Sequence, residues 1–138
     1  ITCLDISDRV LQAARERLEP IHNVGFVRGD MHRLPFDDAR FDQVLLLNAL
    51  SYADDPNAVI REGARVLRRP GRLVAVTLAE HPFVEEAKLY DHVQQGFEPK
   101  ALAHSLVEAG LDVTLCRVTH QEKRRPHFQI ITAHAEKS

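Results

Sequence analysis

Short apolar segments alternate along the chain with stretches in which apolar residues recur every three or four positions. The apolar segments at 1–6, 24–27, 41–48 and 73–78 are typical of β-strands. Helical spacing begins after residue 6, begins again at residue 55, and returns at 102–109, and each stretch ends near a proline or glycine. Two β-rich runs, 111–119 and 127–135, close the chain. The pattern predicts strands connected by helices, followed by a terminal strand pair.

The third apolar segment has no polar residue between Val44 and Leu47. Such a run is typical of a strand covered on both faces, as in a parallel sheet. Asp55 and Pro56 then supply a helix N-cap and a proline at the first helical position. Strands and helices in this order predict a three-layer α/β/α domain, and residues 123–126 suit a hairpin-like connection between the last two strands.

Polar residues follow three of the predicted strands, and these strand ends are where an open parallel sheet binds ligands. Asp5, Asp30 and Asn48 occupy these positions. A carboxylate has two acceptor oxygens and no donor, so Asp5 suits ribose hydroxyls. Asp30 suits the amino group of adenine, with Met31 packed on the base. The ordinary alternatives are a helix cap for Asp5 and a turn for Asp30, but their shared sheet edge favours a nucleoside site.

Composition narrows the class of protein. The 138 residues suffice for one domain, and the formal charge of −2 gives no sign of a nucleic-acid or membrane surface. No apolar run approaches the roughly 20 residues that span a bilayer. Cys3 and Cys116 lie in separate apolar stretches, which indicates free thiols and a cytoplasmic location. The eight histidines form no ligand set, so no metal is expected.

The segment 29–36 reads Gly-Asp-Met-His-Arg-Leu-Pro-Phe, and Phe-Asp-Gln-Val follows at 41–44. Asn48-Ala49-Leu50 and the run Ala-Arg-Val-Leu-Arg-Arg-Pro-Gly-Arg-Leu at 64–73 complete the pattern. This pattern resembles the class I S-adenosylmethionine-dependent methyltransferases of the methyltransferase domain 11 type. The resemblance implies a Rossmann-like sheet, mostly parallel with a terminal antiparallel strand, and S-adenosylmethionine as cofactor. It also implies methyl transfer to an acceptor, expected to be a small molecule that the sequence does not identify.

The resemblance assigns roles to single residues. It implies that Asp5 holds the ribose and that Asp30 with its two following residues holds the adenine. Apart from the resemblance, the strand-end position of Asn48 suits the floor of the same crevice. The cofactor-binding residues expected are therefore Asp5, Ile6, Asp30, Met31, His32 and Asn48.

The chain opens inside a strand pattern, at Ile1, where the family places a strand, a glycine-rich loop and a helix further upstream. We therefore expect residues 1–138 to be a partial methyltransferase domain, from the second strand onward. The absent strand lies, in the family, between the strands that end at Asp5 and Asn48. Because the loop packs on the methionine part of the cofactor, cofactor binding by this chain alone is left open. Arg72 is a further departure, since a second glycine is usual there.

The acceptor pocket of such domains is built by segments after the later strands. Here these are Ser51-Tyr52, where many relatives carry histidine, and the insertion 80–97. Four residues of the insertion can share one helix face: Phe83, Ala87, Tyr90 and Phe97. This face can belong to the core, form a lid or contact the substrate. The substrate-side candidates are Tyr52, His81, Tyr90 and His92. Methyl displacement needs a base only when the acceptor must lose a proton, so no catalytic residue is assigned.

The sequence is also compatible with functions other than methyl transfer. Residues 81–97 and 125–128 also resemble methyltransferase domains fused to a winged-helix regulator of the arsenic-repressor type, which implies DNA contact only through an upstream domain. The rival function is a non-enzymatic module that senses a ligand or dimerises. Unpaired strand edges are sticky, so a homodimer is a further expectation. A short-chain dehydrogenase is excluded, because neither Tyr52 nor Tyr90 has a lysine four residues later.

Overall fold

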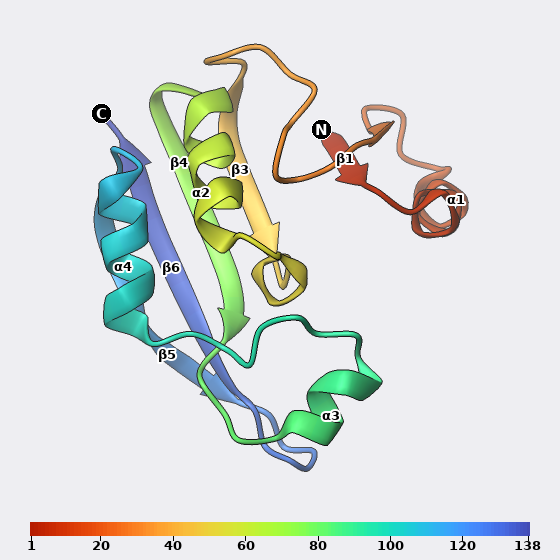
Figure 1. Ribbon diagram of the computed structural model, residues 1–138. Coiled ribbons are helices and arrows are strands. Elements are labelled where there is room, and N and C mark those ends of the chain that lie inside the picture. Colours follow the sequence, from red (N-terminus) through yellow and green to blue (C-terminus); the bar gives the residue numbers. More distant parts are fainter.

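The computed structural model describes residues 1–138, which alternate between strands and helices (Figure 1). In chain order the elements are β1 (Thr2–Asp5), α1 (Asp8–Leu18), β2 (Gly25–Arg28), β3 (Phe41–Leu47), the 3-10 helix η1 (Leu50–Tyr52), α2 (Pro56–Val66), β4 (Leu67–Leu78), α3 (Val84–Leu89), α4 (Pro99–Glu108), β5 (Asp112–Gln121) and β6 (Gln129–Lys137). Each strand and each of the three helices expected from the pattern is present.

The strands form two sheets. β1 and β2 pair in parallel, and their register ends with Asp5 opposite Arg28. The larger sheet has the order β3-β4-β6-β5. β3 and β4 are parallel, whereas β6 runs antiparallel to both of its neighbours. The predicted α/β class and the antiparallel terminal strand are confirmed.

Helices α2 and α4 lie side by side on one face of the larger sheet (Figure 1). The side chain of Asp55 caps α2 by accepting a hydrogen bond from Ala58 N–H at 3.2 Å. Burial of the apolar stripe of α2, more than helix propensity, stabilises this helix. The largest fully buried side chains of the core include Leu50, Ile60, Leu67, Leu73, Leu106 and Ile131.

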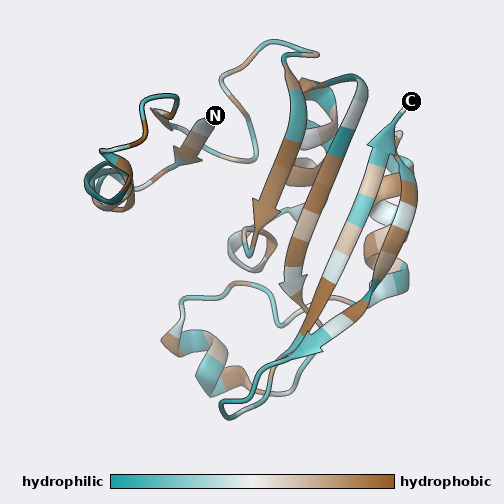
Figure 2. Ribbon diagram, turned by 180° about the vertical axis from the view of Figure 1, so that it is seen from behind, coloured by the Kyte–Doolittle hydropathy of each residue, from teal (hydrophilic) through white to brown (hydrophobic).

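No helix covers the opposite face of the larger sheet, where apolar segments of β3 and β4 are visible (Figure 2). The prediction that residues 44–47 are covered on both faces is therefore wrong for this chain. Leu45 is 54% and Leu47 is 64% exposed, because β3 is an edge strand and only its other face packs on the core. β1 belongs to the other sheet, so the strands that end near Asp5 and Asn48 do not pair with each other.

β4 begins earlier than the pattern predicts. The apolar spacing predicts this strand at 73–78 and leaves residue 67 within the helical stretch that begins at residue 55. Instead α2 ends at Val66, and Leu67 pairs with Phe41 as the first residue of β4. Leu67 is fully buried, in the same core as the apolar stripe of α2.

The insertion 80–97 does not form the long helix that its apolar spacing allows. It contains only the short α3, and Phe97 forms a parallel bridge with Ala79 instead of sharing a helix face with Phe83. Gly96 adopts a φ of +91°, which returns the chain toward the sheet. The expected shared face of Phe83 and Phe97 is therefore wrong.

Candidate cofactor and acceptor site

Asp5 ends β1 at the carboxyl edge of the smaller sheet. Its Oδ1 accepts a hydrogen bond from Ser7 N–H at 2.8 Å, and no protein group donates to Oδ2. Ser7, and not Asp5, caps α1, because its hydroxyl accepts from Val10 N–H at 3.3 Å. The half-buried carboxylate of Asp5 thus keeps one oxygen for a ligand, and the exposed Ile6 follows it.

Asp30 follows β2, the strand that pairs with β1, so the two carboxylates lie at neighbouring strand ends. Oδ1 of Asp30 accepts hydrogen bonds from N–H and from Nδ1 of His32, at 2.8 and 2.7 Å. These bonds, the backbone one foremost, hold the pKa of Asp30 below its usual value. The turn therefore presents a fixed negative charge at the sheet edge.

His32 uses both of its ring nitrogens within the protein. Nε2 accepts a hydrogen bond from Asp55 N–H at 3.2 Å, so in the neutral ring Nδ1 carries the proton and donates it to Asp30. His32 thus positions Asp30 and connects it to the first turn of α2. Met31 is half-buried beside it and packs against the core.

Asn48 follows β3 in the left-handed conformation, with a φ of +54°. Its N–H donates to Val76 O at 2.7 Å, and its Oδ1 accepts from Ser51 Oγ at 3.2 Å. These bonds turn the chain from β3 into η1 and leave Asn48 exposed at the carboxyl edge of the larger sheet. The structure thus pairs Asp5 with Asp30 on one sheet and places Asn48 on the other.

Two residues that the sequence pattern did not single out anchor the segment after β2. Arg65 pairs with Glu62 on α2 and donates to the carbonyls of Leu34 and Phe36, at 3.1 and 2.8 Å. Glu62 accepts from Leu34 N–H at 2.8 Å. The only sequence signal for this network is an acid and a base three residues apart on a helix, a spacing that is also common on solvated faces.

The four substrate-side candidates come together beside η1 and α3. The ring of His92 contacts those of Tyr52 and Tyr90, with ring centres 5.1 and 5.8 Å apart. The ring of His81 lies 4.7 Å from that of Phe128, at the end of the β5–β6 connection. Burial foremost, and then repulsion from a protonated His92, lower the pKa of His81, so the two imidazoles are electrostatic neighbours.

Two ring nitrogens in this group, Nε2 of His81 and Nδ1 of His92, are buried and have no hydrogen-bond partner. Desolvation lowers the pKa of both histidines, so both rings are neutral at neutral pH. Nδ1 of His81 accepts from Phe83 N–H at 3.2 Å, so its proton sits on Nε2. Buried polar atoms are normally paired, so these two closed-off nitrogens are exceptions within the fold.

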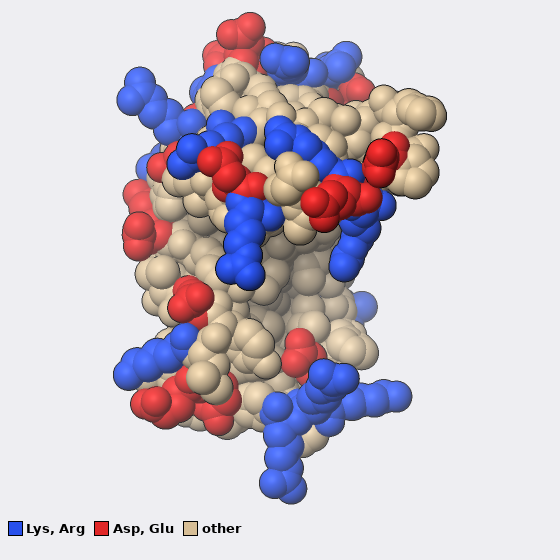
Figure 3. All heavy atoms as spheres, turned by 90° about the vertical axis from the view of Figure 1, so that its right-hand side faces the viewer, with Lys and Arg blue, Asp and Glu red and all other residues tan.

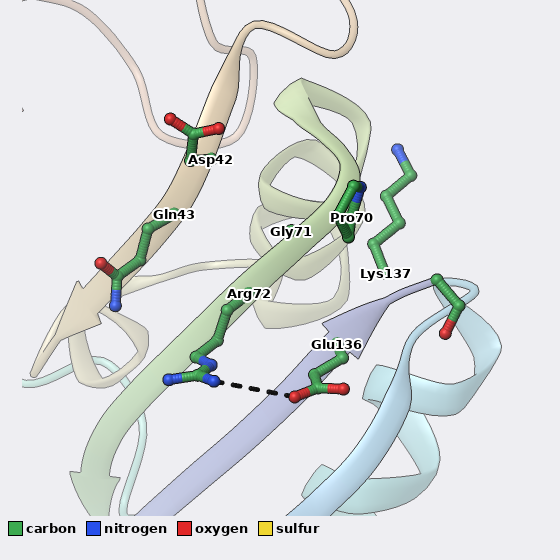
Figure 4. A pocket seen from close by; sticks show the side chains of 8 residues that line it. Asp42, Gln43, Pro70, Gly71, Arg72, Glu136 and Lys137 are labelled. Carbon is green, nitrogen blue, oxygen red and sulfur yellow. Dashed lines mark ion pairs between the residues drawn. The ribbon is translucent and has the colours of Figure 1, made fainter.

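A separate groove of about 510 Å³ lies at the opposite edge of the larger sheet (Figure 4). It is lined by Asp42, Gln43, Pro70, Gly71, Arg72, Glu136, Lys137 and Ser138. Its main cations already have partners: Arg72 lies 3.8 Å from Glu136, and Lys137 Nζ donates to two backbone carbonyls at the end of α2. The groove adjoins the starts of β3 and β4 and contains none of the expected site residues.

No group of three or more His, Cys, Asp or Glu side chains is arranged to hold a metal ion. None of the helices is long and apolar enough to cross a membrane. Cys3 and Cys116 are both free thiols.

Strands connected by helices, with parallel strand pairs in both sheets, define a Rossmann-like α/β fold. The family model described as "Methyltransferase domain" matches residues 1–75, more than half of the chain. The chain belongs to this methyltransferase domain family. Family and fold imply S-adenosylmethionine as cofactor, and the family predicted from the motifs is confirmed.

Relatives and solved structures agree with this assignment. A demethylmenaquinone methyltransferase of Thermotoga maritima is 41% identical over 78 residues, which cover 56% of this chain and 33% of the relative. A malonyl-[acyl-carrier protein] O-methyltransferase of Marinomonas sp. is 30% identical over 116 residues, which cover 80% and 43%. The crystal structure of a SAM-dependent methyltransferase from Methanosarcina mazei shares the fold, with a TM-score of 0.81, 17% identity and coverage of 99% and 81%.

The chain spans less than half the length of the curated relatives it matches. The comparisons give no support to the alternative of a non-enzymatic sensing or dimerisation module. They do not show a fused winged-helix regulator either, and that part stays a prediction.

Proposed function

We propose that the protein containing this chain transfers a methyl group from S-adenosylmethionine to a small-molecule acceptor. The observation that carries the proposal is the pair of carboxylates, Asp5 and Asp30, at neighbouring parallel strand ends. Their segment lies within the residues that match the methyltransferase domain. An acid after each of two adjacent strands suits a nucleoside with both ribose hydroxyls and an amino group.

The side chains fit the nucleoside part of the cofactor. Asp5 keeps an unpaired oxygen for the ribose, and Asp30 is held in one orientation by His32. Ile6 and Met31 add apolar surface next to these acids, and Asn48 adds a carboxamide at the carboxyl edge of the larger sheet. When bound, the cofactor supplies an electrophilic methyl group on a sulfonium sulfur. The protein contributes to catalysis by holding the acceptor in line with that methyl group and by excluding water.

The acceptor belongs on the side of Tyr52, His81, Tyr90 and His92. One relative is named for demethylmenaquinone and another for malonyl-[acyl-carrier protein], so the relatives' names do not agree on a single acceptor. The rings of Tyr52 and Tyr90 both contact the ring of His92. We propose that a small molecule binds between these rings and the sheet edge.

Residues 1–138 are, in this proposal, part of a methyltransferase domain whose sheet has one more strand between β1 and β3. The unpaired edges of these strands and the exposed Leu45 and Leu47 support it. Alternatively, a second copy of the chain pairs with these unpaired strand edges, and the protein is then a homodimer. No DNA contact is proposed for these residues. The free thiols of Cys3 and Cys116 support a cytoplasmic location.

Calorimetric titration of S-adenosylhomocysteine tests the function. The ligand is titrated into this chain and into a version extended toward the N-terminus, each as wild type, Asp5→Ala and Asp8→Ala. Asp8 is the control, because it is exposed on α1 and pairs with Arg28. We expect the extended wild type and Asp8→Ala to bind, and Asp5→Ala to lose binding. Absence of binding by both wild-type forms contradicts the proposal, and sedimentation of the same samples separates monomer from homodimer.

A further inference from the structure

One oxygen of the Asp30 carboxylate is occupied within the protein, and the other is free. Oδ1 accepts two hydrogen bonds from His32, at 2.8 Å from the backbone N–H and at 2.7 Å from Nδ1. No protein group donates to Oδ2. Because two bonds to one oxygen fix the rotation of the carboxylate, His32 sets the direction in which Oδ2 points.

The two side chains differ in how far they reach the surface. The side chain of Asp30 is 52% exposed, whereas that of His32 is 24% exposed. The other ring nitrogen of His32, Nε2, accepts from the N–H of Asp55, the residue that caps α2. Asp30 can therefore meet a ligand directly, whereas both nitrogens of His32 are used within the protein.

A ligand has room to approach this part of the molecule. Figure 3 shows the side that carries the smaller sheet and α3, which is hollowed between its upper and lower parts. Mostly uncharged atoms line the hollow (Figure 3). Asp30 follows β2 at the carboxyl edge of the smaller sheet, the edge at which parallel strands bind ligands.

The bonds from His32 also determine which chemical groups Oδ2 can recognise. They hold the pKa of Asp30 below its usual value, the backbone bond foremost, so the carboxylate is ionised at neutral pH. An ionised carboxylate accepts from an amino group and has no proton to offer to a carbonyl oxygen. Adenine carries an amino group at the position where hypoxanthine carries an oxo group. A site built to accept from the amino group therefore leaves the oxo group unpaired and repelled.

We infer that His32 is a positioning residue that sets the base specificity of the nucleoside site. By holding Oδ1 of Asp30, it turns Oδ2 toward the amino group of adenine, so the site accepts adenine and rejects hypoxanthine. The inference rests on the proposed methyl transfer, because the nucleoside of S-adenosylmethionine is the ligand assigned to Asp30. His32 itself makes no hydrogen bond to the base. Asp55 contributes by accepting no change of tautomer: its N–H keeps the proton of the neutral ring on Nδ1.

A comparison of two bases tests the specificity. Calorimetry measures the binding of S-adenosylhomocysteine and of S-inosylhomocysteine, which carries hypoxanthine, to the protein extended toward the N-terminus. We expect the wild type to prefer the adenine compound by about thirtyfold or more. His32→Phe keeps an aromatic ring without either nitrogen and lowers the preference to about threefold or less. His22→Phe, at an exposed position before β2, is the matched control and keeps the wild-type preference.

Two further variants separate positioning from a structural role. His32→Asn keeps a donor near the place of Nδ1, and we expect a preference of about tenfold or more. Asp30→Asn can turn an amide N–H toward the oxo group, so the preference falls to about threefold or less. A purely structural role of His32 would weaken both ligands by the same factor and leave their ratio unchanged. Circular dichroism confirms that each variant is folded.

Nitrogen-15 NMR of the histidine rings tests the tautomer in this chain. At about pH 9 an imidazole is ordinarily neutral, and we expect the ring of His32 to carry its proton on Nδ1. The signals of His32 are identified by their loss in His32→Phe. A proton on Nε2 would rule out the hydrogen bond from Asp55.

Three results overturn the inference: equal binding of both ligands by the wild type, a wild-type preference in His32→Phe, or a proton on Nε2 of His32. If one of them appears while S-adenosylhomocysteine binding still depends on Asp5, His32 does not set the specificity and the methyltransferase proposal stands. If the wild type does not bind S-adenosylhomocysteine at all, the methyl-transfer proposal is contradicted and this inference with it.

Discussion

Nε2 of His32 accepts a hydrogen bond from the backbone N–H of Asp55 at 3.2 Å. The bond joins the turn after β2, which carries Asp30, to the first turn of α2, which packs on the other sheet. Since the other ring nitrogen of His32 holds the Asp30 carboxylate, one side chain sets both the position of a predicted cofactor contact and its relation to the larger sheet.

Replacement of His32 tests this connection. His32→Ala removes the hydrogen bonds to Asp30 and Asp55, and we expect the free energy of unfolding to fall by about 1–2 kcal/mol. His22→Ala, at an exposed position before β2, is the control and changes stability by less than about 0.5 kcal/mol. Urea unfolding followed by circular dichroism measures both variants. Equal stabilities would show that the two bonds contribute nothing net.

Arg65 has a larger effect on the same segment. Arg65→Met leaves the carboxylate of Glu62 without its cation and the carbonyls of Leu34 and Phe36 without their donor. We expect a loss of about 2–4 kcal/mol, because a partly buried network is broken at one member. Arg61→Met, in the same helix but exposed and 3.9 Å from Asp55, costs less than about 0.5 kcal/mol. Similar losses in the two variants contradict the network.

Acid weakens the fold through Glu62. Hydrogen bonds from Arg65 hold the pKa of Glu62 below its usual value of 4.5 in the folded protein. A lowered folded pKa contributes stability above the unfolded pKa, and this contribution is lost as pH falls through the folded pKa. We therefore expect Glu62→Gln to be less stable than wild type at neutral pH and to show a smaller loss on acidification. The test is the urea midpoint of both proteins, measured from neutral to acidic pH. If the midpoints of wild type and Glu62→Gln fall in parallel, Glu62 is not the source of the acid sensitivity.

Two glycines with similar backbone angles differ in their surroundings. Gly96 has a φ of +91°, and a Cβ there would lie 2.2 Å from Ala79 O, whereas Gly110, with a φ of +89°, has no atom within 4 Å of that position. Gly110→Ala therefore costs only the left-handed strain, about 1 kcal/mol. Gly96→Ala adds a backbone clash, and we expect it to cost about 3 kcal/mol or more. Thermal unfolding compares the pair, and equal losses would show that the bridge between Ala79 and Phe97 opens at little cost.

Much of the fold follows from local pattern. Apolar runs and helical spacing predicted the strand and helix order, and the strand-end positions of Asp5, Asp30 and Asn48 were correct. Element boundaries and contacts that depend on residues far apart in the sequence could not be predicted. Leu67 satisfies a helix stripe and a strand equally well. The spacing of Phe83 and Phe97 permits one helix, but α3 ends at Leu89 and Phe97 bridges to Ala79. Periodicity reports which side of a segment is apolar, but not which neighbour covers it.

The sequence by itself determined the element order, the family motif and the acids that end two parallel strands. These depend on interactions between residues close in the chain and on residue chemistry. Tertiary structure alone decided that Arg65 anchors the segment after β2, that His32 uses both nitrogens within the protein, and that Tyr52, Tyr90 and His92 share one surface. Each of these contacts joins residues from separate turns or elements, and their partnership depends on how the sheets, helices and loops pack rather than on spacing along the chain.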